Sequence, residues 1–189
     1  GIIYLAVARN RLSQEWQGEG RDQLAIWLIL AGHFAYSLAA VILFQEATLT
    51  VAIAAQAVSL AWVIRRFNAP ELGWLLKLTL AAVVMRLTFN PWLLTYSGNA
   101  HWSLYAYGGA TLLCAVATWL LAAHHKLRAW LEAVTLHLFV LTLWAEARYW
   151  LYDGQIFSEQ YGFIEAAINA NAWGALGLVY YWRSRVSNH

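Results

Sequence analysis

Charged residues are scarce in this chain. Only 12% of its 189 residues are Asp, Glu, Lys or Arg, whereas 61% are hydrophobic. Soluble domains are about 25% charged and about 45–50% apolar. The formal net charge of +2 is accompanied by no basic stripe, so the composition also argues against a nucleic-acid-binding surface. We therefore predict a protein whose main partner is the lipid bilayer.

Cysteine is nearly absent as well, because Cys114 is the only one in the sequence. No disulfide can form within the chain, and no cluster of thiolates can hold a metal. The sequence also has no HExxH motif, no phosphate-binding glycine loop and no nucleophile elbow. We accordingly predict no metal and no cofactor. The chain opens without an initiator Met, a basic n-region or a cleavage site, and we expect a fragment that starts partway through a helix.

Long apolar runs dominate what is present. A helix needs about 20 apolar residues to cross the hydrocarbon core, and the residue before a proline is pushed out of the helical region, so Asn90-Pro91 ends one run. We predict an all-α, polytopic transmembrane bundle that forms one domain over residues 1–189. It should contain a truncated N-terminal span at residues 1–8 and six full spans at residues 24–44, 48–64, 71–89, 103–123, 127–150 and 163–182.

Basic residues recur at every second helix end. They are Arg9, Arg11, Arg21, Arg65, Arg66, Lys126, Arg128, Arg183 and Arg185. The intervening turns, at residues 45–47, 90–102 and 153–162, contain no Lys or Arg. Because cytoplasmic loops hold the excess of these residues, we predict a cytoplasmic C-terminus.

Small residues recur every four positions in three of the predicted spans. Such stripes let helix backbones approach each other in lipid. Cys114 is best interpreted as one small member of its stripe. The stripes are Ala31, Ala35 and Ala39; Ala106, Ala110, Cys114, Thr118 and Ala122; and Ala166, Ala170 and Gly174.

Four sequence stretches resemble a known family. They are RLTFNPWLLTY (86–96), WSLYAYGG (102–109), LWAEARYWLYDG (143–154) and WGALGLVYYWRSR (173–185). The chain resembles the C-terminal part of the proteins known as domain of unknown function 2339, which are large bacterial membrane proteins with many consecutive spans. The resemblance implies a bacterial inner-membrane location and a longer parent protein whose N-terminal spans are further partners. It implies no activity.

Charged residues inside the apolar runs are the strongest functional signal. Arg86, Glu146, Arg148 and Glu165 come from three predicted spans and lie at a similar depth near the predicted outer face. Unpaired charges in that setting are costly. We therefore predict that Arg86 pairs with Glu146 or Glu165 and that Arg148 pairs with the other carboxylate.

Three interpretations of this cluster remain open. In the leading one, a non-enzymatic protein transports or binds an envelope-related molecule in a periplasm-facing pocket, where arginines receive an anionic group and aromatic rings stack on sugar or lipid. In the second, the pairs only hold helices in register. In the third, a membrane-embedded transferase acts on lipid-linked sugars with Asp153 or His101. The candidate ligand-binding residues are Arg86, Asn90, Trp92, Tyr96, Tyr105, Tyr107, Glu146, Arg148 and Glu165.

Overall fold

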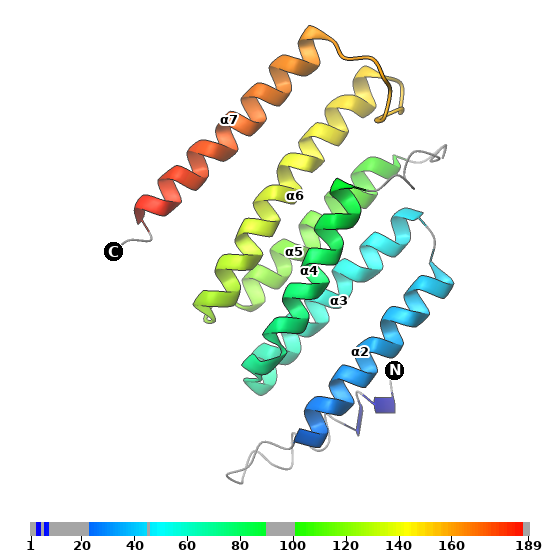
Figure 1. Cartoon of the computed structure of the whole chain (residues 1–189), viewed down its shortest axis with the longest axis vertical. Coiled ribbons are helices and arrows are strands. Elements are labelled where there is room, and N and C mark those ends of the chain that lie inside the picture. Colours follow the sequence, from blue (N-terminus) through cyan, green and yellow to red (C-terminus); the bar gives the residue numbers. More distant parts are fainter. Residues whose placement is uncertain (1–2, 5, 8–22, 45, 90–100, 187–189) are drawn as a thin grey trace.

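The fold is a bundle of helices that run in alternating directions (Figure 1). The structure, a computed structural model, describes residues 3–4, 6–7, 23–44, 46–89 and 101–186, and within these ranges all regular structure is helical. The all-α prediction is therefore confirmed. In chain order the elements are α2 (Gln23–Leu43), α3 (Glu46–Phe67), the 3-10 turn η1 (Pro70–Leu72), α4 (Gly73–Thr88), the π-helix η3 (Leu104–Gly108), α5 (Gly109–Leu120), α6 (His125–Leu151) and α7 (Phe163–Val186).

The prediction of six full spans is not supported. Of the six α-helices described, three are long and apolar enough to cross a bilayer, over Ile26–Leu43, Thr48–Phe67 and His125–Leu151. The 3-10 turn at η1 leaves only 16 residues for α4, and η3 with α5 forms a shorter apolar helix over Leu104–Leu120. Helix α7 has 24 residues but is not among these three, and it includes one glutamate, two asparagines and two arginines. The sequence thus locates the helices but overestimates how many qualify as spans. The predicted truncated span at residues 1–8 lies largely outside the described residues.

The contact between α3 and α5 is the most extensive helix pair described, and small side chains are buried on both helices. Ala54, Ala57 and Ala61 of α3 are fully buried, as are Ala110 and Cys114 of α5. Because there is little hydrophobic drive between helices in lipid, close backbone approach supplies the attraction. This part of the predicted stripe is confirmed, and Cys114 is one of its packing residues.

The other two predicted stripes do not have this role within the described structure. Ala31, Ala170 and Gly174 are exposed, and a Cβ added at Gly174 would meet nothing within 4 Å. The helices that carry them, α2 and α7, lie at opposite flanks of the bundle (Figure 1). Within α7 only Glu165 and Leu176 are buried. The flanking helices therefore present apolar surface outward.

Hydroxyl and cation–π contacts join the inner helices. The hydroxyl oxygens of Thr111 and Thr142 lie 2.9 Å apart, and each also lies within hydrogen-bond distance of the backbone carbonyl four residues earlier. Because each hydroxyl has one proton, one hydroxyl donates to its carbonyl and the other donates across to the first hydroxyl. Lys77 of α4, the lysine in the apolar run, places Nζ 5.4 Å from the ring centroid of Trp130 on α6. These contacts satisfy polar groups that would be costly to leave unpaired in lipid.

Candidate functional site

The two ends of the bundle carry different charges. Helices α3 and α7 end, and α6 begins, at the same end of the bundle (Figure 1). This end, which we call the basic end, carries Arg65, Arg66, Lys126, Arg128, Arg183 and Arg185. There, Glu132 accepts a hydrogen bond of 2.6 Å from Arg128 and also pairs with Arg183 of α7. Arg9, Arg11 and Arg21 lie outside the described residues. The other end, which we call the opposite end, holds the predicted charge cluster.

At the opposite end, Arg148 of α6 pairs with Glu165 of α7. Arg148 Nη1 lies 3.1 Å from Glu165 Oε1, and the two side chains are 11% and 1% exposed. Arg148 Nη2 also donates to the backbone carbonyls of Ser158 and Gln160 in the connection between the two helices. The predicted pairing of Arg148 with a glutamate is confirmed, and it joins α6, α7 and their connecting loop.

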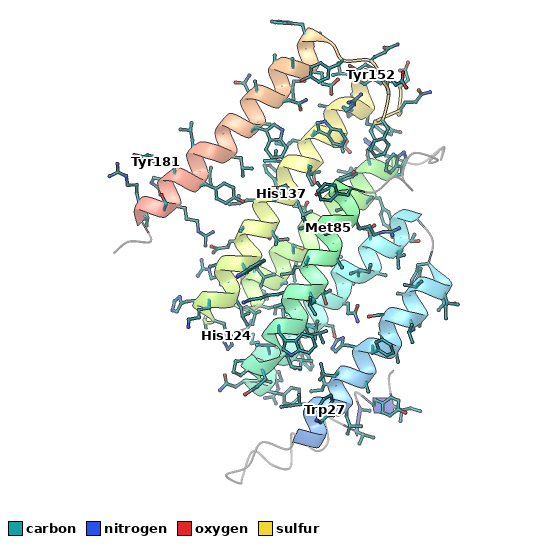
Figure 2. All side chains as sticks on the ribbon, viewed as in Figure 1. Trp27, Met85, His124, His137, Tyr152 and Tyr181 are labelled. Atoms are coloured by element: carbon teal, nitrogen blue, oxygen red, sulfur yellow. The ribbon has the colours of Figure 1, made fainter. Side chains whose placement is uncertain are left out.

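Tyr152 completes this arrangement just beyond the end of α6, where Figure 2 labels it. Its phenol donates a 2.7 Å hydrogen bond to Glu165 Oε2 and accepts one from the Gly162 N–H. The rings of Tyr152 and Trp144 lie 5.0 and 5.7 Å from the Arg148 guanidinium carbon. The hydrogen bond to Glu165, followed by burial, raises the pKa of Tyr152, so the phenol remains a donor at neutral pH. We call Arg148, Tyr152 and Glu165, with the two loop carbonyls, the clamp.

Glu146 has partners that the sequence did not indicate. Its Oε1 accepts a 2.8 Å hydrogen bond from Ser103 Oγ, and its Oε2 lies 2.7 Å from His101 Nε2. The His101 ring stacks on Tyr149 at 4.0 Å between centroids and meets Trp150 edge-on. Both partners come from the segment that leads into η3, more than 40 residues away in sequence, so no local spacing could have revealed them.

Arg86 belongs to a different contact. Its Nε donates a 2.9 Å hydrogen bond to Oγ1 of Thr50, a fully buried residue of α3. The prediction that Arg86 pairs with Glu146 or Glu165 is wrong, because those carboxylates bind His101, Ser103 and the clamp. The physical reason is the rotation of α4, which turns Arg86 toward α3 rather than toward α6 and α7.

The predicted aromatic residues are dispersed. Tyr107 is 1% exposed, and its hydroxyl donates a 3.1 Å hydrogen bond to the carbonyl of Leu87 in the last turn of α4. It therefore packs between helices instead of facing a ligand. Tyr105 is 51% exposed. Asn90, Trp92 and Tyr96 lie outside the described residues.

The chemistry available differs between the clamp and Glu146. The Arg148 Nη atoms and both Glu165 oxygens face partners inside the protein. By contrast, the side chains of His101 and Glu146 are 32% and 19% exposed, so this carboxylate can still meet an external hydroxyl group. Asp153, a candidate of the transferase interpretation, adopts a left-handed turn conformation with φ 49° where α6 ends. No three His, Cys, Asp or Glu side chains gather as a metal would require in the ranges that the structure describes.

Comparison with known proteins gives one match. The family model described as "Predicted membrane protein (DUF2339)" matches residues 1–189. No curated protein and no solved structure matches the chain. The match therefore spans all four sequence stretches on which the family resemblance depends.

Proposed function

The chain belongs to the DUF2339 family of predicted membrane proteins, and on that basis we propose that it is a non-enzymatic structural module of the bacterial inner membrane. The closed clamp is the main support. An anionic ligand at Arg148 would have to displace Glu165, which is 1% exposed, or the loop carbonyls. Breaking a buried ion pair leaves a charge without compensation, so this arginine is better suited to holding α6 and α7 together than to exchanging ligands.

The flanks of the bundle indicate what such a module would pack against. Trp27 and Phe34 on α2 and Leu178 and Trp182 on α7 are all more than 60% exposed, and small residues such as Gly174 leave room for a close neighbour. In lipid, small residues on an open face favour contact with another helix. We propose that further membrane helices of the longer parent protein cover these faces.

Chemical accessibility tests the structural proposal. In the purified protein, a water-soluble carbodiimide with a small amine should modify Glu159 in the exposed α6–α7 loop and leave Glu165 unmodified, because only the first carboxylate meets water. Mass spectrometry of the digested protein gives the modified fraction at each site. Glu159 is the matched control on the same loop. Modification of Glu165 to a similar extent would mean that the clamp is open and would contradict the structural role.

A second candidate function uses Glu146 instead of the clamp. This carboxylate is partly exposed beside Trp150, a ring that is 75% exposed. A carboxylate next to an open aromatic face suits a hydroxyl-rich envelope molecule such as a glycan. In the same carbodiimide experiment, this function requires Glu146 to be reactive and to be shielded by a neutral oligosaccharide.

We further propose the topology that the basic residues favour. The basic end would face the cytoplasm, together with the C-terminus, because Lys and Arg concentrate there. All six α-helices would then connect the two faces. Although α4 and α5 are short, the 17 residues of Leu104–Leu120 reach about 26 Å at ~1.5 Å per residue, close to the ~30 Å hydrocarbon core. Neighbouring helices would shield the polar residues of α7.

Cysteine labelling tests this topology. In a Cys114→Ala background, Gln155→Cys in the α6–α7 loop should react with a membrane-impermeant maleimide in intact spheroplasts. Ala123→Cys and Val186→Cys at the basic end should react only after permeabilisation. All three positions are exposed, so labelling depends on the compartment rather than on burial. Labelling of Gln155→Cys and Val186→Cys from the same side would contradict the proposed topology.

A further inference from the structure

Two arginines at the basic end have aromatic rings as neighbours instead of carboxylates. Arg65 and Arg66 are exposed in the last turn of α3, where the helix dipole favours a positive charge. The guanidinium carbon of Arg65 lies 5.5 Å from the ring centroid of Trp119 on α5, and that of Arg66 lies over the ring of Phe67. Within the described structure neither arginine makes a hydrogen bond or an ion pair. Their N–H groups are therefore available to an external acceptor.

The carboxylates of the described helices at this end face other groups. Glu132 contacts Arg128 and Arg183, and Glu71 of η1 lines the space between α2, α3 and α4. By contrast, Lys126 in the first turn of α6 is exposed, and it too makes no ion pair in the part of the chain that the structure describes. Arg65, Arg66 and Lys126 thus give this end a positive charge that the described residues do not compensate.

A short connection brings Lys126 to the level of Arg65. Backbone hydrogen bonds of 2.9–3.3 Å close the turn at residues 121–124, between α5 and α6. Figure 2 shows His124 at this end of α6. Helix α6 therefore starts beside the end of α5, where Arg65 lies over Trp119, and Lys126 adds its charge to the same region.

Next to these charges, the outward face of α5 is apolar. Leu112, Val116 and Trp119 follow one another at helical spacing and are all exposed. Residues with this spacing lie on one face of a helix, and the last of them is the ring under Arg65. The faces that we assign to further helices belong instead to α2 and α7, at the two flanks (Figure 1). A molecule along α5 would have its apolar part beside Leu112 and Val116 and a polar part beside Arg65.

Phosphate is the acceptor that suits these basic groups. A guanidinium binds phosphate oxygens through paired N–H donors, and stacking on an aromatic ring leaves those donors free at its edge. Basic residues at the surface of a bilayer also attract anionic lipids. A zwitterionic phospholipid carries the same phosphate but has no net charge, so uncompensated cations favour a lipid whose net charge is negative.

We propose that the basic end binds an anionic phospholipid. Arg65, Arg66 and Lys126 hold its phosphate, and an acyl chain lies along Leu112 and Val116 of α5. This site is independent of the structural role of the clamp, because it lies at the other end of the bundle and uses other residues. It is also independent of which face of the membrane the basic end occupies.

Native mass spectrometry of the purified protein in a non-ionic detergent tests the proposal. Dioleoylphosphatidylglycerol should bind roughly fivefold or more tightly than dioleoylphosphatidylcholine, since each basic residue near an anionic lipid contributes about that factor. The two lipids have the same acyl chains, so the difference measures the headgroup. Glycerol phosphate carries the anionic group without chains and should not displace the lipid. Displacement at equal concentration would mean a site for a small soluble anion and would overturn the proposal.

The variants separate this site from the general charge of the basic end. Arg65→Gln should weaken binding of dioleoylphosphatidylglycerol about fivefold and leave binding of dioleoylphosphatidylcholine nearly unchanged. Arg185→Gln is the matched control, because Arg185 is an exposed arginine at the same end but on α7, where it bonds to Tyr181. Both are surface substitutions, so both variants should fold like the wild type. Equal losses in the two variants would overturn the proposal, as would equal binding of the two lipids by the wild-type protein.

Discussion

Replacing Glu165 by alanine is expected to destabilise the protein by about 3–5 kcal/mol, the usual effect of removing one member of a buried ion pair. The carboxylate is 1% exposed and contacts both Arg148 and Tyr152. Without it, the Arg148 guanidinium, only 11% exposed, keeps its charge and loses its counter-ion. The free energy of unfolding can be measured by titration with a denaturing detergent, with loss of helical circular dichroism as the signal.

The double variant Arg148→Met/Glu165→Leu distinguishes loss of the pair from general damage to the helices. It removes both charges together, so it should cost several kcal/mol less than the sum of the single Arg148→Met and Glu165→Leu variants. Arg185→Ala is the control for loss of an arginine. Arg185 is exposed in the last turn of α7 and bonds only to Tyr181 among the described residues, so its loss should change stability by about 0.5 kcal/mol or less. Additive single effects would contradict the clamp.

The comparison between Arg148 and Arg86 shows what the sequence can predict about a charge cluster. Position along a helix gives depth, and the cost of an unpaired charge in lipid then predicts that opposite charges meet. That argument correctly predicts that Arg148 meets one of the two glutamates, and the structure identifies it as Glu165 on the next helix. It fails for Arg86, whose partner depends on which neighbour α4 turns toward. Arg86 donates a hydrogen bond to the hydroxyl of Thr50, and no charge pattern identifies a threonine.

The number of spans was harder to predict than the positions of the helices. Apolar runs and the Asn90-Pro91 break locate each helix within a few residues. The end of a helix, however, depends on local backbone geometry, such as the 3-10 turn at Pro70–Leu72 before α4 and the π-helical turn at Leu104–Gly108 before α5. These turns shorten the α-helical length without changing the apolar composition.

Small-residue stripes gave a similarly partial answer. The spacing correctly predicts that Ala106, Ala110 and Cys114 face another helix, where all three are fully buried. The same spacing in α7 predicts a contact that the described structure does not contain at Ala170 and Gly174. A stripe shows that the side chains on one face of a helix are small enough for another helix to pack closely. It does not show whether that helix belongs to the same chain.

Ala54→Leu gives the second large effect. Ala54 is fully buried on α3, the helix whose contact with α5 is the most extensive described. Three extra carbon atoms would push the helices apart, at a cost of about 1–3 kcal/mol for overpacking. The wider separation would also weaken the van der Waals attraction between the two backbones. The detergent titration described for Glu165 should show this decrease in unfolding free energy.

The adjacent residue supplies a matched control for this substitution. Ala55 is exposed, because one step along a helix rotates the side chain by about 100°. Ala55→Leu adds the same volume to the same helix but projects it outward, and it should change stability by about 0.5 kcal/mol or less. Since the two variants have the same composition, helix propensity and depth within one residue, a difference between them can come only from what each face of α3 contacts. Equal destabilisation by both would mean that α3 is packed on both faces, and the α3–α5 contact would then not be the centre of the bundle.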